Sequence, residues 1–164
     1  MNQRPTLFST KLFGLLQKAE IVLWLGFILG LLLYYGSYPS RSILIISLSG
    51  LAIVFFLGAY QPSNIQRKED EKLGFSDLIY TTIAPKALGI SLAVACIGIL
   101  FYFINSNPMG AKQMLTLGGF STAIASAIIL IGVATNAKNI KEIIPNLYRA
   151  LPLMGACFYL LSIL

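Results

Sequence analysis

Long apolar runs separated by short polar segments dominate the chain. A helix that crosses a bilayer needs roughly 20 apolar residues, and its backbone polar groups must be satisfied within the helix. The pattern therefore predicts an all-α polytopic membrane protein with five transmembrane helices. Their apolar runs are Ile21–Tyr35, Ile43–Tyr60, Ala87–Ile104, Leu115–Thr135 and Leu147–Leu164. The fifth run contains Arg149 and Pro152 near its start, and a re-entrant or surface-packed segment is the alternative there.

The segments that lead into the first, third and fifth runs carry apolar residues at helical spacing. These positions are Leu12, Phe13, Leu15 and Leu16, then Leu78, Ile79 and Ile83, then Ile140, Ile143, Ile144 and Leu147. Such spacing predicts short amphipathic helices on the inner membrane surface, with a docking face for a cytoplasmic partner as the alternative. Pro85 and Pro145 are expected to end or bend these helices where the chain enters the membrane.

The same order of features occurs twice, which indicates an internal duplication within a single membrane domain, 1–164. Phe8-Ser9, Lys18-Ala19 and Pro39 correspond to Phe75-Ser76, Lys86-Ala87 and Pro108, at offsets of 67, 68 and 69. The repeats cover about 8–60 and 75–135, and 136–164 reads as a partial third copy. Each full copy is a helical hairpin. The segments YYGSYPSRS (34–42) and FYFINSNPMGAK (101–112) supply its proline-containing outer turn.

These hairpins resemble those of small inner-membrane proteins of Bacteroidetes, including the membrane component of the gliding-motility and type IX secretion motor. In that family the turn reads like His-Trp-Pro-Gly followed by an apolar run. Here Tyr38-Pro39-Ser40 and Asn107-Pro108-Met109-Gly110 take that place, without the His and Trp. The resemblance implies a hairpin architecture. The family's motor function would need an acidic group within the membrane.

Composition and charge place the protein in a membrane and give it an orientation. The chain has 57% hydrophobic and 11% charged residues, whereas soluble domains carry about 25% charged residues. Of the 12 Lys and Arg residues, ten fall on alternate loops that include the N-terminal segment, and only Arg41 and Lys112 fall on the others. Cytoplasmic loops concentrate these residues. The N-terminus is thus expected inside, the C-terminus outside, and the location in the inner (cytoplasmic) membrane. The +6 charge then reflects topology, and nucleic-acid binding is not expected.

Little in the spans points to catalysis, and neither cofactor nor metal ligand set is expected. The acidic residue nearest to the spans, Glu20, is expected at the surface, paired with Lys18. Cys96 and Cys157 lie inside the third and fifth runs at similar depths, and both are expected to be small buried apolar residues. The charged loop 66–72 reads as a solvated connection or a partner contact.

Small residues at four-residue spacing predict helix packing. They are Gly26 and Gly30 in the first span, and Gly119, Ala123 and Ala127 in the fourth, beside the row Gly118, Thr122 and Ser126. The fourth span is therefore expected to be the most enclosed, or to form a dimer face.

Two functions fit these patterns. One is a non-enzymatic scaffold or accessory subunit of an inner-membrane assembly, in contact with lipid and with other membrane proteins or further copies. The alternative is a small transporter or channel built from parallel hairpin repeats, with Ser91, Ser121 and Thr122 lining its pocket. A lipid-modifying enzyme would need more polar residues at the headgroup level.

Overall fold

The computed structural model describes residues 7–61, 78–104, 108–135 and 143–164, and within these ranges the side chains of 7–13 and 81 are not described. The described residues form five α-helices and one π-helical turn, with no strand among them. The α-helices are α1 (Leu7–Tyr35), α2 (Arg41–Ala59), α4 (Ala84–Ile104), α5 (Pro108–Ala134) and α6 (Ile144–Ile163), and the π turn is η1 (Ile79–Ile83). The predicted all-α architecture is confirmed.

Four helices, α1, α2, α4 and α5, are long and apolar enough to cross a membrane. These correspond to the first four predicted runs. Each helix begins earlier than its apolar run, by 14 residues in α1 and by seven in α5. Helix α6 has 20 residues but is not among the four, since Asn146, Arg149 and two prolines make it less apolar.

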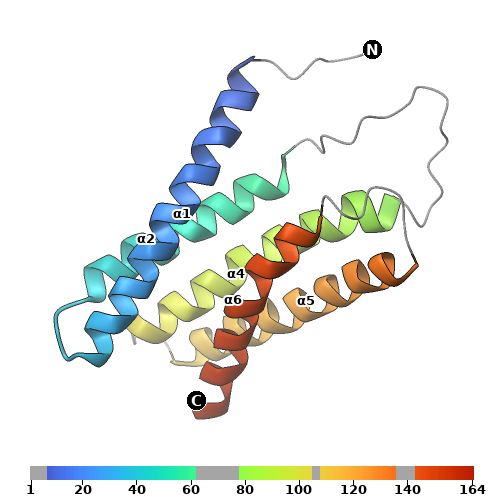
Figure 1. Cartoon of the computed structure of the whole chain (residues 1–164). Helices are drawn as coiled ribbons and strands as arrows, with labels where there is room; N and C mark the ends of the chain where they lie inside the picture. Colours follow the sequence, from blue (N-terminus) through green and yellow to red (C-terminus); the bar gives the residue numbers. More distant parts are fainter. Residues whose placement is uncertain (1–6, 62–77, 105–107, 136–142) are drawn as a thin grey trace, which may run out of the picture.

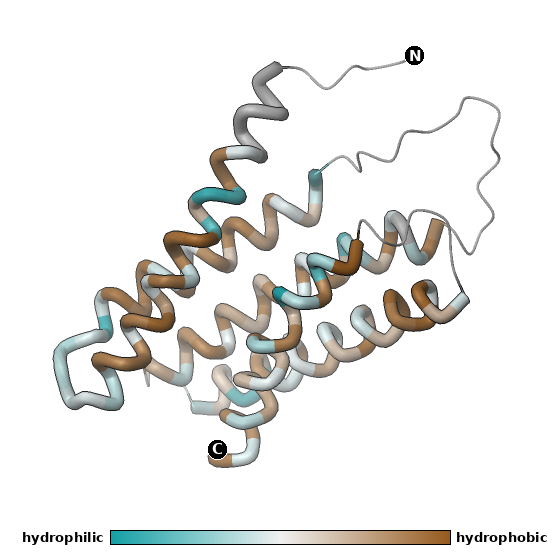
Figure 2. Tube along the Cα trace, viewed as in Figure 1, coloured by the Kyte–Doolittle hydropathy of each residue, from teal (hydrophilic) through white to brown (hydrophobic). Residues whose placement is uncertain are grey.

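The helices are arranged as two antiparallel hairpins with α6 across the second (Figure 1). The ends of α1 and α4 and the starts of α2 and α5 lie at one end of the molecule, called here the turn end. The hairpins meet where α2 packs on α4, and α6 crosses over α4 and α5. Most residues along the helices are apolar, and more hydrophilic stretches occur in α1, at the start of α6 and at the turn between α1 and α2 (Figure 2).

The most enclosed of the four candidate spans is α4, not α5 as the small-residue rows predicted. Half of its apolar segment is buried, against 39% for α5. The reason is its position: α4 contacts α2, α5 and α6, whereas α5 has extensive contacts only with α4 and α6. Leu88, Ala95, Cys96 and Ile99 of α4 have at most 1% of their surface exposed.

The segments that lead into the helices differ from the predicted interfacial helices. Residues 7–18 continue into the first span as one uninterrupted helix. Before Pro85 the chain forms η1, in which the N–H of Ala84 donates to the carbonyl of Ile79. Proline has no N–H and its ring crowds the preceding turn, so a local i→i+5 pattern replaces the α-helical one without ending the helix. Pro145 lies in the first turn of α6, where its missing N–H is not needed.

Several predicted features lie outside the described residues. They are the charged loop 66–72, the start of the second repeat at 75, Asn107 of the second turn, and the apolar position Ile140.

Candidate functional site

The glycines of the first span lie against α2. A Cβ built on Gly26 would be 2.6 Å from the hydroxyl of Ser47, and one on Gly30 would be 2.8 Å from Cδ2 of Leu44. A methyl group at either position would require a side chain of α2 to move, so the two glycines fit a close approach of the helices, as expected at small-residue contacts. Both glycines therefore contribute to the α1–α2 hairpin itself.

The glycines of α5 let two helices approach from different sides. A Cβ on Gly118 would lie 2.6 Å from the backbone of Ala95 in α4, and one on Gly119 would lie 3.3 Å from Cβ of Cys157 in α6. Along the two rows, Thr122 and Ser126 are buried like Gly118, whereas Ala123 is half-buried and Ala127 is exposed. The row that begins at Gly118 thus faces the bundle along its length, and the row that begins at Gly119 turns outward.

The same contacts bring the two cysteines together. Cys96 follows Ala95 on α4, and Cys157 of α6 packs on Gly119, so the neighbouring glycines of α5 place both thiols at the junction of three helices. Both side chains are buried and free, and they are close enough to interact electrostatically. No cluster of three metal-ligating side chains occurs among the described residues.

The hydroxyls expected to line a transport pocket lie on α4 (Ser91) and α5 (Ser121 and Thr122). The Ser91 hydroxyl donates to the carbonyl of Ala87 at 2.8 Å, and that of Ser121 donates to the carbonyl of Leu117 at 2.5 Å. Each bond returns to the residue's own helix, as is common for hydroxyls in lipid. Thr122 has no exposed surface. Two of the three hydroxyls are therefore occupied within their own helices, and the third is enclosed.

An ion pair links α1 to α6, and sequence reasoning missed it. Glu20 is 6% exposed, and its carboxylate lies 3.1 Å from Nη1 of Arg149. The Trp24 side chain, one helical turn later, lies close to the same carboxylate. The predicted surface pair with Lys18 is wrong. Residues two apart on a helix point in different directions, and Glu20 shares the buried face of α1 with Leu16 and Phe27.

The position of this pair makes it the strongest candidate for a functional site in the helical part of the molecule. Ionisable residues within membrane-spanning segments are expensive and are kept for a structural or functional reason. Here the carboxylate belongs to the first helix and the guanidinium to the last, and these two helices make few other contacts. The pair can therefore hold the first hairpin to α6. The one signal in the sequence is that Glu20 lies four residues after Leu16 and seven before Phe27, which puts it on the same helix face as these two apolar residues.

Comparisons with protein-family models, with curated proteins and with solved structures find no match for this chain.

Proposed function

We propose that this protein is a non-enzymatic scaffold or accessory subunit of an inner-membrane assembly. The observation that carries the proposal is the engagement of the polar groups at depth: the hydroxyls of Ser91 and Ser121 bond within their own helices, and Thr122 is enclosed. A transport route needs polar groups available to a substrate. With two of these hydroxyls bonded within their own helices and the third enclosed, we assign the function to the outer surface.

Helix α1 is the surface we assign to a partner. Only 17% of its apolar segment is buried, against 39% to 50% for α2, α4 and α5. Its exposed face carries Val22, Leu25, Leu29 and Leu32. Intervals of three and four residues are the spacing at which one helix packs along another. The occupant we propose is a transmembrane helix of another membrane protein.

The ion pair supports this role because it fixes the direction of the docking face. Helix α1 packs along α2 on one side, and Glu20 attaches it to Arg149 of α6. With both attachments made, the row from Val22 to Leu32 keeps a defined orientation relative to the rest of the bundle. A partner then meets a preorganised surface and loses less conformational entropy on binding.

In-membrane crosslinking followed by mild detergent extraction tests the scaffold. We expect a tagged chain to recover a defined membrane protein, and the double variant Leu25→Trp with Leu29→Trp to lower that recovery about tenfold, roughly 1.4 kcal/mol. The matched control places tryptophan at Ile124 and Ile131, which are equally exposed on α5. A chain that is monodisperse alone and whose melting temperature rises with a small ligand would contradict the proposal.

One observation favours the transporter alternative. The hydroxyls of Thr122 and Ser126 lie one turn apart on α5, are buried, and have no hydrogen-bond partner. We expect Thr122→Val to leave partner recovery unchanged and the melting temperature equal or higher. Valine replaces the unsatisfied hydroxyl of threonine by a methyl group of similar size. Loss of a ligand-dependent melting shift in this variant would instead favour transport.

A further inference from the structure

The turn between α1 and α2 borders an open hollow of about 440 Å³. Backbone bonds from Gly36 to the carbonyl of Leu32 and from Tyr38 to that of Leu33 close the turn, and Ser37 adopts a left-handed conformation with φ of 62°. The hollow is large enough for a small ligand or a lipid headgroup. It is lined by Tyr34, Ser37, Tyr38, Pro39, Ser40, Arg41 and Ser42.

The first turn of α2 contributes positive potential to this hollow. The helix has 19 residues, no acidic side chain in its first turn, and an N-cap residue, Ser40, whose side chain makes no capping bond. The first N–H groups of a helix have no partner within it, and together with the helix dipole they favour an anion. The guanidinium of Arg41, the first residue of α2, adds a full charge on an exposed side chain.

Ser40 provides a second and independent indication of a ligand. Ser40 is among the residues that line the hollow and is only 2% exposed, yet its hydroxyl has no hydrogen-bond partner. A buried hydroxyl without a partner destabilises a protein, so an N-cap serine that neither caps its helix nor meets water is unfavourable in the free protein. An anion in the hollow would accept a hydrogen bond from this hydroxyl and remove this cost.

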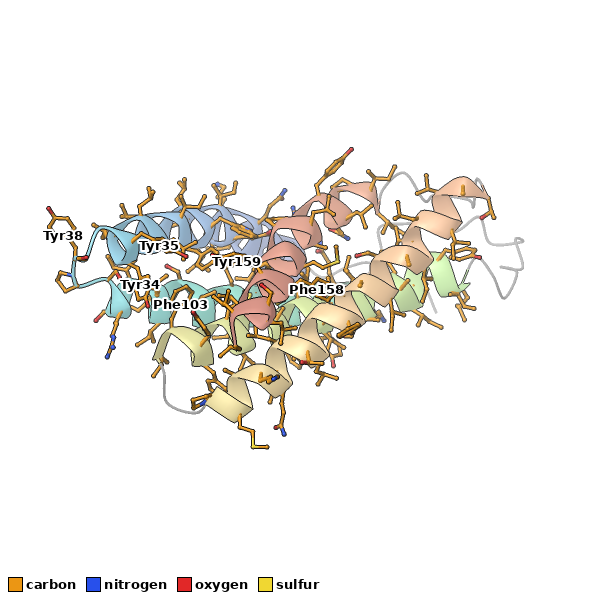
Figure 3. All side chains as sticks on the ribbon, turned by 90° about the horizontal axis from the view of Figure 1, so that it is seen from below. Tyr34, Tyr35, Tyr38, Phe103, Phe158 and Tyr159 are labelled. Carbon is orange, nitrogen blue, oxygen red and sulfur yellow. The ribbon has the colours of Figure 1, made fainter. Side chains whose placement is uncertain are left out.

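The walls of the hollow are fixed to the body of the protein. Tyr34 packs edge-on against Phe103 of α4, with ring centroids 5.0 Å apart, and Figure 3 shows these two side chains together while Tyr38 lies at the tip of the turn. The contact joins the first hairpin to the second at the turn end. One wall of the hollow is thus held by α4 rather than by the turn alone.

We propose that this hollow binds an anionic phosphate group, and that its occupant is the headgroup of a membrane phospholipid. The donors are the first N–H groups of α2, the Ser40 hydroxyl and the Arg41 guanidinium. Lipid is the source we assign because the hollow lies at the end of two membrane-spanning helices, beside exposed Tyr35 and Tyr38. Tyrosines of this kind are common at the headgroup level. The exposed apolar side chains of Ile45 and Ile46 on α2 are available to acyl chains. This site is independent of the proposed scaffold role.

The test uses the full chain in nanodiscs of phosphatidylcholine with or without phosphatidylglycerol, and native mass spectrometry counts the lipid retained. We expect preferential retention of phosphatidylglycerol, lowered about tenfold by Arg41→Gln, because charge-assisted hydrogen bonds are the strong ones. Ser40→Ala is expected to lower retention too, with an unchanged or higher melting temperature in lipid-free detergent. The matched control is Lys112→Gln, which removes an exposed positive charge from the first turns of α5 at the same end.

A parallel measurement with inorganic phosphate in detergent separates the two sources of the anion. Selective retention of phosphatidylglycerol that depends on Arg41, with no melting shift by phosphate, assigns the lipid. A melting shift by phosphate that Arg41→Gln abolishes assigns free phosphate to the same site. Equal losses in Arg41→Gln and Lys112→Gln would overturn the proposal, as would retention in Ser40→Ala equal to that of the unmodified chain.

Discussion

Replacing Arg149 by methionine is expected to lower the free energy of unfolding by about 2–3 kcal/mol. The substitution leaves the buried carboxylate of Glu20 without its cationic partner, and removing one member of a buried pair is strongly destabilising. We expect less than the roughly 3–5 kcal/mol that is typical of fully buried pairs, because the Arg149 side chain is 38% exposed and part of its attraction is screened by solvent. Equilibrium unfolding in mixed micelles measures the change.

A double-mutant cycle separates the ion pair from the loss of the arginine side chain. Glu20→Gln keeps a polar side chain of nearly the same size and removes the buried charge, so adding it to Arg149→Met is expected to restore most of the lost stability. Lys86→Met is the matched control, since Lys86 is exposed near the start of α4. If the effects of the two substitutions simply add, the pair does not hold α1 to α6.

Gly118→Ala is expected to destabilise the protein by about 2–3 kcal/mol, near the upper end for an overpacked core. The added methyl group would lie 2.6 Å from the backbone nitrogen and Cα of Ala95. Because the obstacle is backbone rather than a flexible side chain, α4 and α5 must separate to admit it. The same unfolding measurement in mixed micelles reports the loss.

Gly155→Ala on α6 is the matched control for this substitution. No atom lies within 4 Å of a Cβ built there, so the change should stabilise the helix by about 0.5–1 kcal/mol through the higher helix propensity of alanine. Equal effects of the two variants would show that the closeness of α4 and α5 at Gly118 does not limit stability.

The four apolar runs could be predicted because lipid sets both the length and the conformation of a spanning segment. The ends of the helices were predicted better than their starts: Tyr35 and Ile104 end both the predicted runs and the observed helices. Hydropathy marks where apolar side chains begin, whereas backbone hydrogen bonding continues through the polar residues before them. Residues 7–18 therefore joined α1, although their amphipathic spacing predicted a separate helix.

The candidate sites depended on contacts between distant parts of the chain, which spacing alone does not give. Glu20 and Arg149 lie near opposite ends of the sequence, and their pairing requires α6 to cross back toward α1. The central position of α4 follows from how the second hairpin docks on α2. The apolar runs of α4 and α5 alone do not show which of the two helices is the more enclosed. The hollow could be identified only from the backbone conformation of residues 36–40, since the sequence YYGSYPSRS predicts a turn and no more.

The ion pair also sets an order for membrane assembly. A chain made from its N-terminus delivers α1 to the bilayer first, while Arg149 belongs to the last helix. Glu20 is therefore without its cationic partner while α2, α4 and α5 insert. During that interval the glycine contacts with α2 are what hold α1 within the first hairpin. The link between α1 and α6 can form only when α6 arrives, so the pairing of Glu20 with Arg149 follows the insertion of α2, α4 and α5.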